Sequence, residues 1–223
     1  MTSTNFRLSG ALKTLAAVFT AALLVTFASP AGAVTFTFSD IDNAGDGTDE
    51  GAALNGQFTV DVTDAGGGLA QFLFSNIGPL DSSIEQINFD NAAIVLASIN
   101  SIVNGGPGVD FEFGNPNLPE GNLVSFDEDF GVVADNPAPF NGVNPGETVA
   151  VIFNLVGGAT FDDVIAALIA GDLRIGFHAI ALANGGSDSF INDIPDIPLP
   201  AAFPLMLAGI AGLSFASRKK KKA

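Results

Sequence analysis

The chain has 223 residues, with 24 acidic and eight basic side chains, one histidine and no cysteine. Without cysteine it can form no disulfide framework, no zinc–thiolate site and no thiolate nucleophile. Its formal net charge of −16 excludes nucleic acid as a partner, because binding to phosphates requires clusters of lysine and arginine.

Residues 1–33 have the pattern of a secretory signal peptide. Arg7 and Lys13 supply a sparse positive charge, and an apolar stretch follows them. Ala31 and Ala33 place small side chains at the −3 and −1 positions of a cleavage site. The sequence therefore predicts a signal helix whose partners are the Sec-type export machinery and signal peptidase. The alternative is a retained transmembrane helix, for which the apolar stretch is short.

Residues 34–192 are predicted to form one ectodomain, which is long enough to bury a core. All 24 acidic residues lie between Val34 and Asp196, where Arg174 is the only arginine or lysine, so this stretch carries a formal charge of about −23. Self-repulsion of this size keeps an exported domain soluble. It also argues against adhesion to an anionic membrane surface.

Apolar and polar side chains alternate in several short segments of this domain. Alternation with one apolar face is typical of half-buried strands in an antiparallel sheet. Turns rich in glycine, asparagine and proline separate the segments. The sequence predicts a mainly β fold, an antiparallel β-sandwich of the jelly-roll or immunoglobulin-like kind with about eight strands. The predicted strands are residues 34–38, 58–63, 71–75, 84–89, 109–113, 149–155 and 173–179, and the turns are residues 66–68, 104–107, 144–146 and 184–186.

Two acidic clusters are candidates for a calcium site, and no other cofactor is expected. Residues 40–50 combine carboxylates with glycines, which together can surround a hard cation. The EF-hand spacing is absent, because Ala44 and Ala53 stand at positions 3 and 12 counted from Asp42. Residues 127–129 form the second cluster, and solvated acidic loops are the alternative for both. The candidate ligands are Asp40, Asp42, Asp46, Asp49, Asp127 and Asp129.

One segment, residues 160–171, departs from the alternating pattern. Thr160 can cap a helix, and Asp162 and Asp163 would then lie at the positive end of its dipole. Gly171 suits the position just after the last helical residue. The pattern predicts one short helix that packs against the sandwich.

Residues with catalytic potential are few. His178 is the only histidine, so any serine triad must use it. No G-x-S-x-G elbow is present, and we interpret Ser187 and Ser189 as turn residues. A carboxylate pair can hydrolyse glycosides, but among so many surface acids a pair has no diagnostic value. We expect no catalytic residues. The absence of tryptophan and tyrosine argues against sugar binding, because the alternation assigns phenylalanine to the core.

The C-terminus has the pattern of a membrane anchor. Residues 193–198 form a proline-rich linker, and residues 199–217 carry no charge. As a helix that stretch would be roughly 28 Å long, close to the roughly 30 Å of a bilayer core. The basic residues after it would remain in the cytoplasm by the positive-inside rule. The alternative is a buried core helix with a solvated basic tag. The membrane-stop residues are Arg218, Lys219, Lys220, Lys221 and Lys222.

The anchor and the motif before it, residues 197–223, resemble a known sorting signal. The motif is Ile197, Pro198, Leu199, Pro200 and Ala201. It resembles the C-terminal signals of the PEP-CTERM class, and most closely the VPLPA-CTERM variant of Gram-negative bacteria, which usually has valine in place of Ile197. Residues 141–190 resemble ectodomains that precede such tails, and that resemblance implies no activity.

The resemblance implies an exosortase-like membrane protease that cuts near the motif, and association with exopolysaccharide. The sequence thus predicts an exported, non-catalytic protein, first anchored in the inner membrane and then found at the cell surface or in the extracellular matrix. One alternative is a calcium-assisted carbohydrate-binding module, and another is a secreted glycoside hydrolase that uses two carboxylates.

Overall fold

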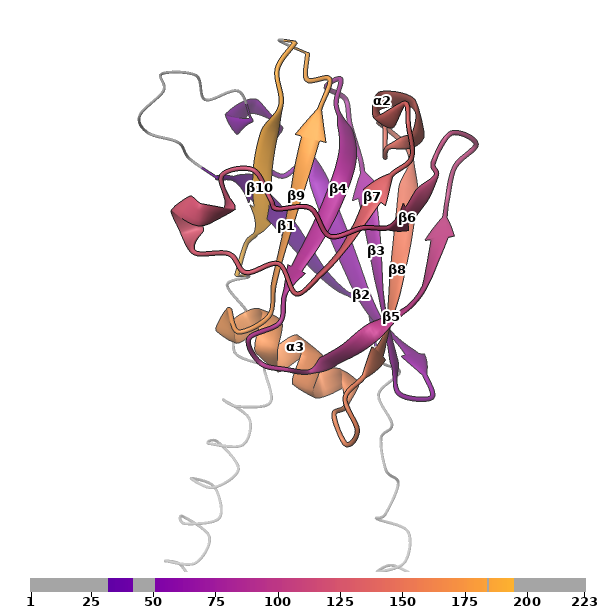
Figure 1. Cartoon of the computed structure of the whole chain (residues 1–223), viewed down its shortest axis with the longest axis vertical. Coiled ribbons are helices and arrows are strands. Elements are labelled where there is room, and N and C mark those ends of the chain that lie inside the picture. Colours follow the sequence, from indigo (N-terminus) through magenta and orange to yellow (C-terminus); the bar gives the residue numbers. More distant parts are fainter. Residues whose placement is uncertain (1–31, 42–50, 184, 195–223) are drawn as a thin grey trace, which may run out of the picture. The chain divides into compact units, whose positions relative to one another are not determined.

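The computed structural model describes residues 32–41, 51–183 and 185–194, and within them ten antiparallel strands form one nearly closed sheet (Figure 1). Its strand order is β5-β8-β3-β2-β1-β10-β9-β4-β7-β6. The prediction of a mainly β, antiparallel fold is confirmed. The strands are β1 (Val34–Asp40), β2 (Phe58–Gly66), β3 (Leu69–Asn76), β4 (Ser83–Asp90), β5 (Leu96–Asn104), β6 (Phe111–Phe113), β7 (Phe130–Ala134), β8 (Thr148–Leu155), β9 (Arg174–Ile180) and β10 (Asp188–Asn192).

Helices are few and short in the described part of the chain. They are α2 (Ala138–Asn141), α3 (Phe161–Ala170) and the 3₁₀ turns η1 (Ala52–Leu54) and η2 (Gly121–Val124). No helix there is both long and apolar enough to cross a bilayer. The predicted signal helix, except for its last two residues, and the predicted transmembrane helix lie outside the described residues.

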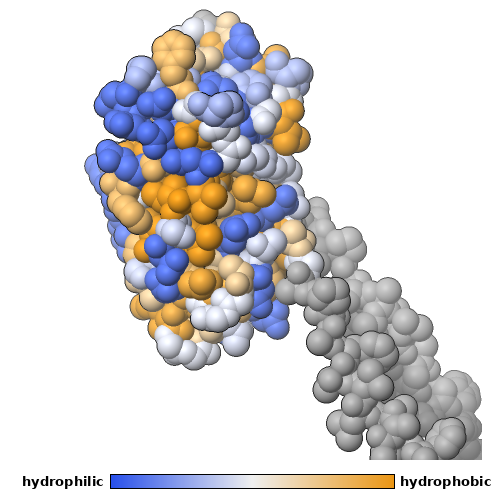
Figure 2. All heavy atoms as spheres, turned by 90° about the vertical axis from the view of Figure 1, so that its right-hand side faces the viewer, coloured by the Kyte–Doolittle hydropathy of each residue, from blue (hydrophilic) through white to orange (hydrophobic). Residues whose placement is uncertain are grey.

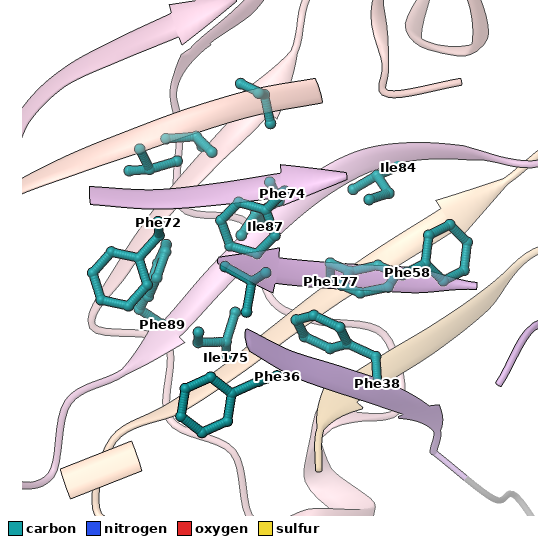
Figure 3. Close-up of a cluster of buried hydrophobic side chains, with 14 of the residues drawn as sticks. Phe36, Phe38, Phe58, Phe72, Phe74, Ile84, Ile87, Phe89, Ile175 and Phe177 are labelled. Carbon is teal, nitrogen blue, oxygen red and sulfur yellow. The ribbon is translucent and has the colours of Figure 1, made fainter. Parts of the chain in front are cut away.

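Strand β1 joins the two halves of the sheet. Residues 34–37 pair with β2, whereas residues 38–40 pair with β10. The side chains of Phe36 and Phe38 both point into the core between the halves, as Figure 3 shows. One continuous strand therefore ties β5-β8-β3-β2 to β10-β9-β4-β7-β6.

Phenylalanine rings fill the centre of this core (Figure 3). The ring of Phe177 lies 4.7 Å from that of Phe38 and 4.9 Å from that of Phe58, both edge-to-face. Phe89 and Phe153 make a similar pair at 4.7 Å. Pairs of this kind add roughly 0.5–1.5 kcal/mol to the free energy gained from burial alone. Because phenylalanine has no polar atom, the rings pack without any need for hydrogen-bond partners.

Helix α3 begins and ends as the sequence predicts. Thr160 accepts a hydrogen bond from the backbone N–H of Asp163 at 3.3 Å, and the Asp163 carboxylate accepts one from the backbone N–H of Thr160 at 2.8 Å. Gly171 takes the left-handed conformation, φ +75°, that ends the helix. Val164 and Leu168, one turn apart, are buried and hold α3 against the strands.

Thr160→Ala is expected to lower the free energy of unfolding by about 1 kcal/mol, because the first turn loses its cap. The hydroxyl of Thr160, and then its backbone amide, lower the pKa of Asp163 below the ordinary 3.8. The contribution of Asp163 to the free energy of unfolding is therefore fully present above its ordinary pKa of 3.8, and it is lost as the pH falls through the lower pKa of the folded state. Urea unfolding at pH 7 measures the difference. Thr160→Ser keeps the hydroxyl and should behave as wild type, and an equal loss in both variants would contradict the capping role.

Three strands lie where the sequence predicts none: β5, β7 and β10. In β5 the pairing with β8 shifts register twice, between Leu96 and Ser98 and between Ile99 and Ser101, which breaks the apolar alternation. Strand β7 is mostly buried and contains no polar residue, so it shows no alternation of apolar and polar side chains. Strand β10 follows directly on a glycine-rich turn, which hides its start in the sequence. Because Ser189 lies within β10, its interpretation as a turn residue is wrong.

Candidate functional site

The acidic segment 127–129 belongs to a long loop, residues 114–129, that crosses the outer face of β4 and β9 (Figure 1). On β4, Gln86 donates hydrogen bonds to the carbonyl groups of Pro116 and Asn117. On β9, Gly176 has no side chain, and Leu118 packs into the space that this leaves. The loop therefore forms an outer cover on this half of the sheet.

The carboxylates of residues 127–129 do not converge on a common point. Asp129 accepts a hydrogen bond from the backbone N–H of Asn91 at 2.7 Å, and Glu128 accepts one from that of Leu118 at 2.8 Å. The backbone N–H of Asp127 donates to Asp90 at 3.3 Å. These bonds fasten the two ends of the loop.

Metal ligands are not grouped in the described part of the chain, where no three histidine or acidic side chains stand close enough to share an ion. Asp40 ends β1, and its backbone N–H donates to the side chain of Asn55 at 2.8 Å. The structure does not bring Asp40 together with Asp127 and Asp129. Three other predicted ligands, Asp42, Asp46 and Asp49, lie outside the described residues.

Arg174 holds the covering loop to β4 and β9. Its guanidinium pairs with Asp90, with Nε 3.1 Å from the carboxylate. It also donates to the carbonyl groups of Val124, at 2.7 Å, and Ser125. The guanidinium carbon lies 5.3 Å from the centre of the Phe126 ring. Because its donors are engaged in this way, the one arginine of the domain has a structural role and is not available as a cation for a ligand.

His178 lies beside two residues of the types found in serine hydrolases. Its Nδ1 is 2.7 Å from the Glu85 carboxylate, and on β10 its direct cross-strand neighbour is Ser189. However, Ser189 is fully buried, with 0% of its surface exposed, and its hydroxyl has no hydrogen-bond partner among the described residues. A nucleophile must reach its substrate, so this array offers no reactive centre to a molecule in solvent.

A cleft lies at the seam where the two free edges of the sheet, β5 and β6, approach each other. Asn104 bridges one end, because its side-chain oxygen accepts a hydrogen bond from the backbone N–H of Phe111 at 3.1 Å. Beyond this bridge a cavity of about 400 Å³ separates the edges. We call it the seam cleft; it is lined by Ser98 and Ile99 and by residues 113–115 and 129–131.

The floor of the seam cleft is the margin of the main core. Ile99 and Phe130 pack against that core, and the ring of Phe130 lies 5.4 Å from that of Phe153. Phe113, at the end of β6, is 63% exposed. Figure 2 faces this side of the molecule and shows an apolar area bordered by polar side chains. The assignment of Phe113 to the core is therefore wrong, because its side chain lines the seam cleft, which is open to solvent.

Comparisons of the chain with protein-family models, with curated proteins and with solved structures found no match. Function is therefore inferred from the signals and the geometry of this chain alone. Of the sites described above, the seam cleft is the one that is open to solvent and lined by both apolar and polar side chains.

Proposed function

We propose that this chain is an exported, non-catalytic cell-surface or extracellular-matrix protein of the PEP-CTERM type. In this proposal an exosortase-like protease cuts the inner-membrane precursor near residues 197–201, and the released domain associates with exopolysaccharide. The motif, the uncharged stretch and the basic end of the tail carry the proposal.

The limits of the folded unit support this proposal. Strand β1 begins at Val34, the residue after the predicted cleavage site. At the other end, Asp193 accepts hydrogen bonds from the hydroxyls of Thr37 and Ser39, both at 2.7 Å, and its N–H donates to the carbonyl of Thr37 at 2.9 Å. The chain thus enters and leaves the sheet on neighbouring strands. A leader and an anchor can both be attached there without disturbing the core.

The remaining parts of the proposal follow from the sequence. Residues 1–33 form the signal helix and residues 199–217 the transmembrane helix, with Lys219 and its neighbours in the cytoplasm. The sheet belongs with β-sandwiches of the jelly-roll or immunoglobulin-like kind. The burial of Ser189 and the engagement of Arg174 support a non-catalytic role, since neither group is available to a substrate.

A double variant, Pro198→Ala with Pro200→Ala, tests the processing step. Proline and the residue before it favour an extended backbone, which is the shape that a protease binds. In the native host, the wild type should appear in the surface fraction without its C-terminal residues, whereas the double variant should accumulate uncut in the membrane fraction. Pro107→Ala, an exposed turn proline of the folded unit, is the matched control and should be processed normally. Normal processing of the double variant would refute recognition of the motif.

A further inference from the structure

The seam cleft combines an exposed aromatic ring with a polar rim, on a domain of strong negative charge. We propose that this cleft binds an uncharged sugar unit of a polysaccharide chain. The inference rests on the proposed association with exopolysaccharide and names the surface responsible for it. It also reverses the sequence argument against sugar binding, because that argument placed every phenylalanine of the strands in the core.

The apolar part of the cleft matches the C–H face of a sugar ring. Phe113 is 63% exposed, and Phe130 and Ile99 are half-buried beside it. Aromatic rings hold apolar faces by burial and by the attraction of C–H groups to their electron-rich faces. The cavity volume of about 400 Å³ falls within the range of small-ligand pockets.

The polar rim offers both acceptors and a donor for hydroxyl groups. One oxygen of Asp129 accepts a single hydrogen bond, from the backbone of Asn91, which leaves most of the acceptor capacity of the carboxylate for a ligand. The Ser98 oxygen accepts a hydrogen bond from Asn154 at 3.1 Å, so its O–H remains able to donate.

Asn115 is held in place before any ligand arrives. Its side-chain N–H donates to the carbonyl of Glu128 at 2.7 Å, and its side-chain oxygen accepts from Asn88 at 3.2 Å. The second lone pair of that oxygen is available to a ligand. A rim fixed in advance loses little side-chain entropy on binding.

Other occupants fit this cleft less well. A peptide strand needs a continuous ladder, but the edge of β5 is broken by two register shifts and β6 has only three residues. A second copy of the domain would bring together two charges of about −23, and an anionic polymer would meet the same repulsion. An uncharged sugar needs neither a ladder nor a positive charge.

The test is affinity electrophoresis of the full-length chain, purified from producing cells in detergent. The gels contain one neutral polysaccharide each, namely dextran, galactomannan, xylan or mixed-linkage glucan, or alginate as the anionic control. We expect retardation by at least one neutral polysaccharide and none by alginate. Retardation by none of the neutral polysaccharides, or equal retardation by alginate, would overturn the proposal.

Phe113→Ala should weaken the retardation about tenfold, because the stacking ring is lost. Phe113→Trp should preserve or strengthen it and, as the only tryptophan of the chain, should change its fluorescence when sugar is added. Phe140→Ala removes a ring that is 73% exposed on α2, outside the cleft, and is the matched control. Equal effects of Phe113→Ala and Phe140→Ala would overturn the assignment to the cleft.

The same variants separate this inference from the function on which it rests. In producing cells, Phe113→Ala should be exported and shortened like the wild type, but it should be lost from the matrix into the medium. If the wild type binds a neutral polysaccharide in the gel and is never shortened in cells, the processing proposal fails and the cleft assignment stands. If processing is normal and no neutral polysaccharide retards the chain, the cleft assignment fails alone.

Discussion

Arg174→Ala is expected to lower the free energy of unfolding by up to about 3–5 kcal/mol, the loss typical when one partner of a fully buried ion pair is removed, since the Arg174 side chain is 24% exposed. The side chain of Asp90 is only 7% exposed, so its carboxylate would remain in the protein without a counter-charge. The carbonyl groups of Val124 and Ser125 would lose their donors at the same time. Chemical unfolding followed by far-UV circular dichroism measures the change.

Two companions sharpen this test. Arg174→Lys keeps the charge but cannot donate to Asp90 and to both carbonyl groups at once. Its free energy of unfolding should therefore lie between those of the wild type and Arg174→Ala. Hydrogen exchange should show faster opening of the loop 114–129 in both variants, because the hydrogen bonds of Arg174 hold that loop to β9. A decrease of less than about 1 kcal/mol in the free energy of unfolding of Arg174→Ala, as for an exposed ion pair, would contradict this structural role of Arg174.

Phe177→Ala is expected to cost about 3–5 kcal/mol, because it opens a cavity at the centre of the core. The ring is fully buried, at 0% exposure, and lies between Phe38, Phe58 and Phe190. Phe177→Leu leaves part of the volume filled and should cost less. The matched control, Phe140→Ala, removes an exposed ring and should change the unfolding free energy by less than about 0.5 kcal/mol. Similar losses for Phe177→Ala and Phe140→Ala would contradict the core assignment.

Local pattern predicts the regular parts of this fold well. Alternation locates seven strands, β1 to β4, β6, β8 and β9, and the cap at Thr160 and the stop at Gly171 locate α3. These features depend on residues that are neighbours in the sequence, and for that reason the sequence predicts them correctly. Three strands are missed: bulges interrupt the alternation in β5, β10 follows a glycine-rich turn, and β7 has no polar residue to alternate with its apolar ones.

Long-range features could not be predicted in the same way. The change of partner in the middle of β1 and the position of β5 and β6 as free edges depend on the order of ten strands, which no local pattern contains. The exposure of Phe113 follows from that order. Its own alternation with Glu112 resembles that of a buried strand.

The acidic clusters show why composition alone is a poor guide to a site. Asp127 and Asp129 are close in sequence, but they bond differently: the Asp129 carboxylate accepts from the backbone N–H of Asn91, whereas Asp127 donates its backbone N–H to Asp90. Arg174 is informative already in the sequence, as the only arginine or lysine of the domain. A lone arginine in a domain of about −23 is drawn to several acceptors at once, which favours a structural joint over a free cation.

The central claim is that the folded domain is released from two flanking signals, and the intact mass of the protein in the surface fraction of native cells tests it directly. We expect a chain that begins at Val34 and ends between residues 198 and 201, while the membrane fraction holds a longer form that still contains Lys219 to Lys222. A surface-fraction protein that retains Met1 or the basic end, Arg218 to Lys222, would contradict the account.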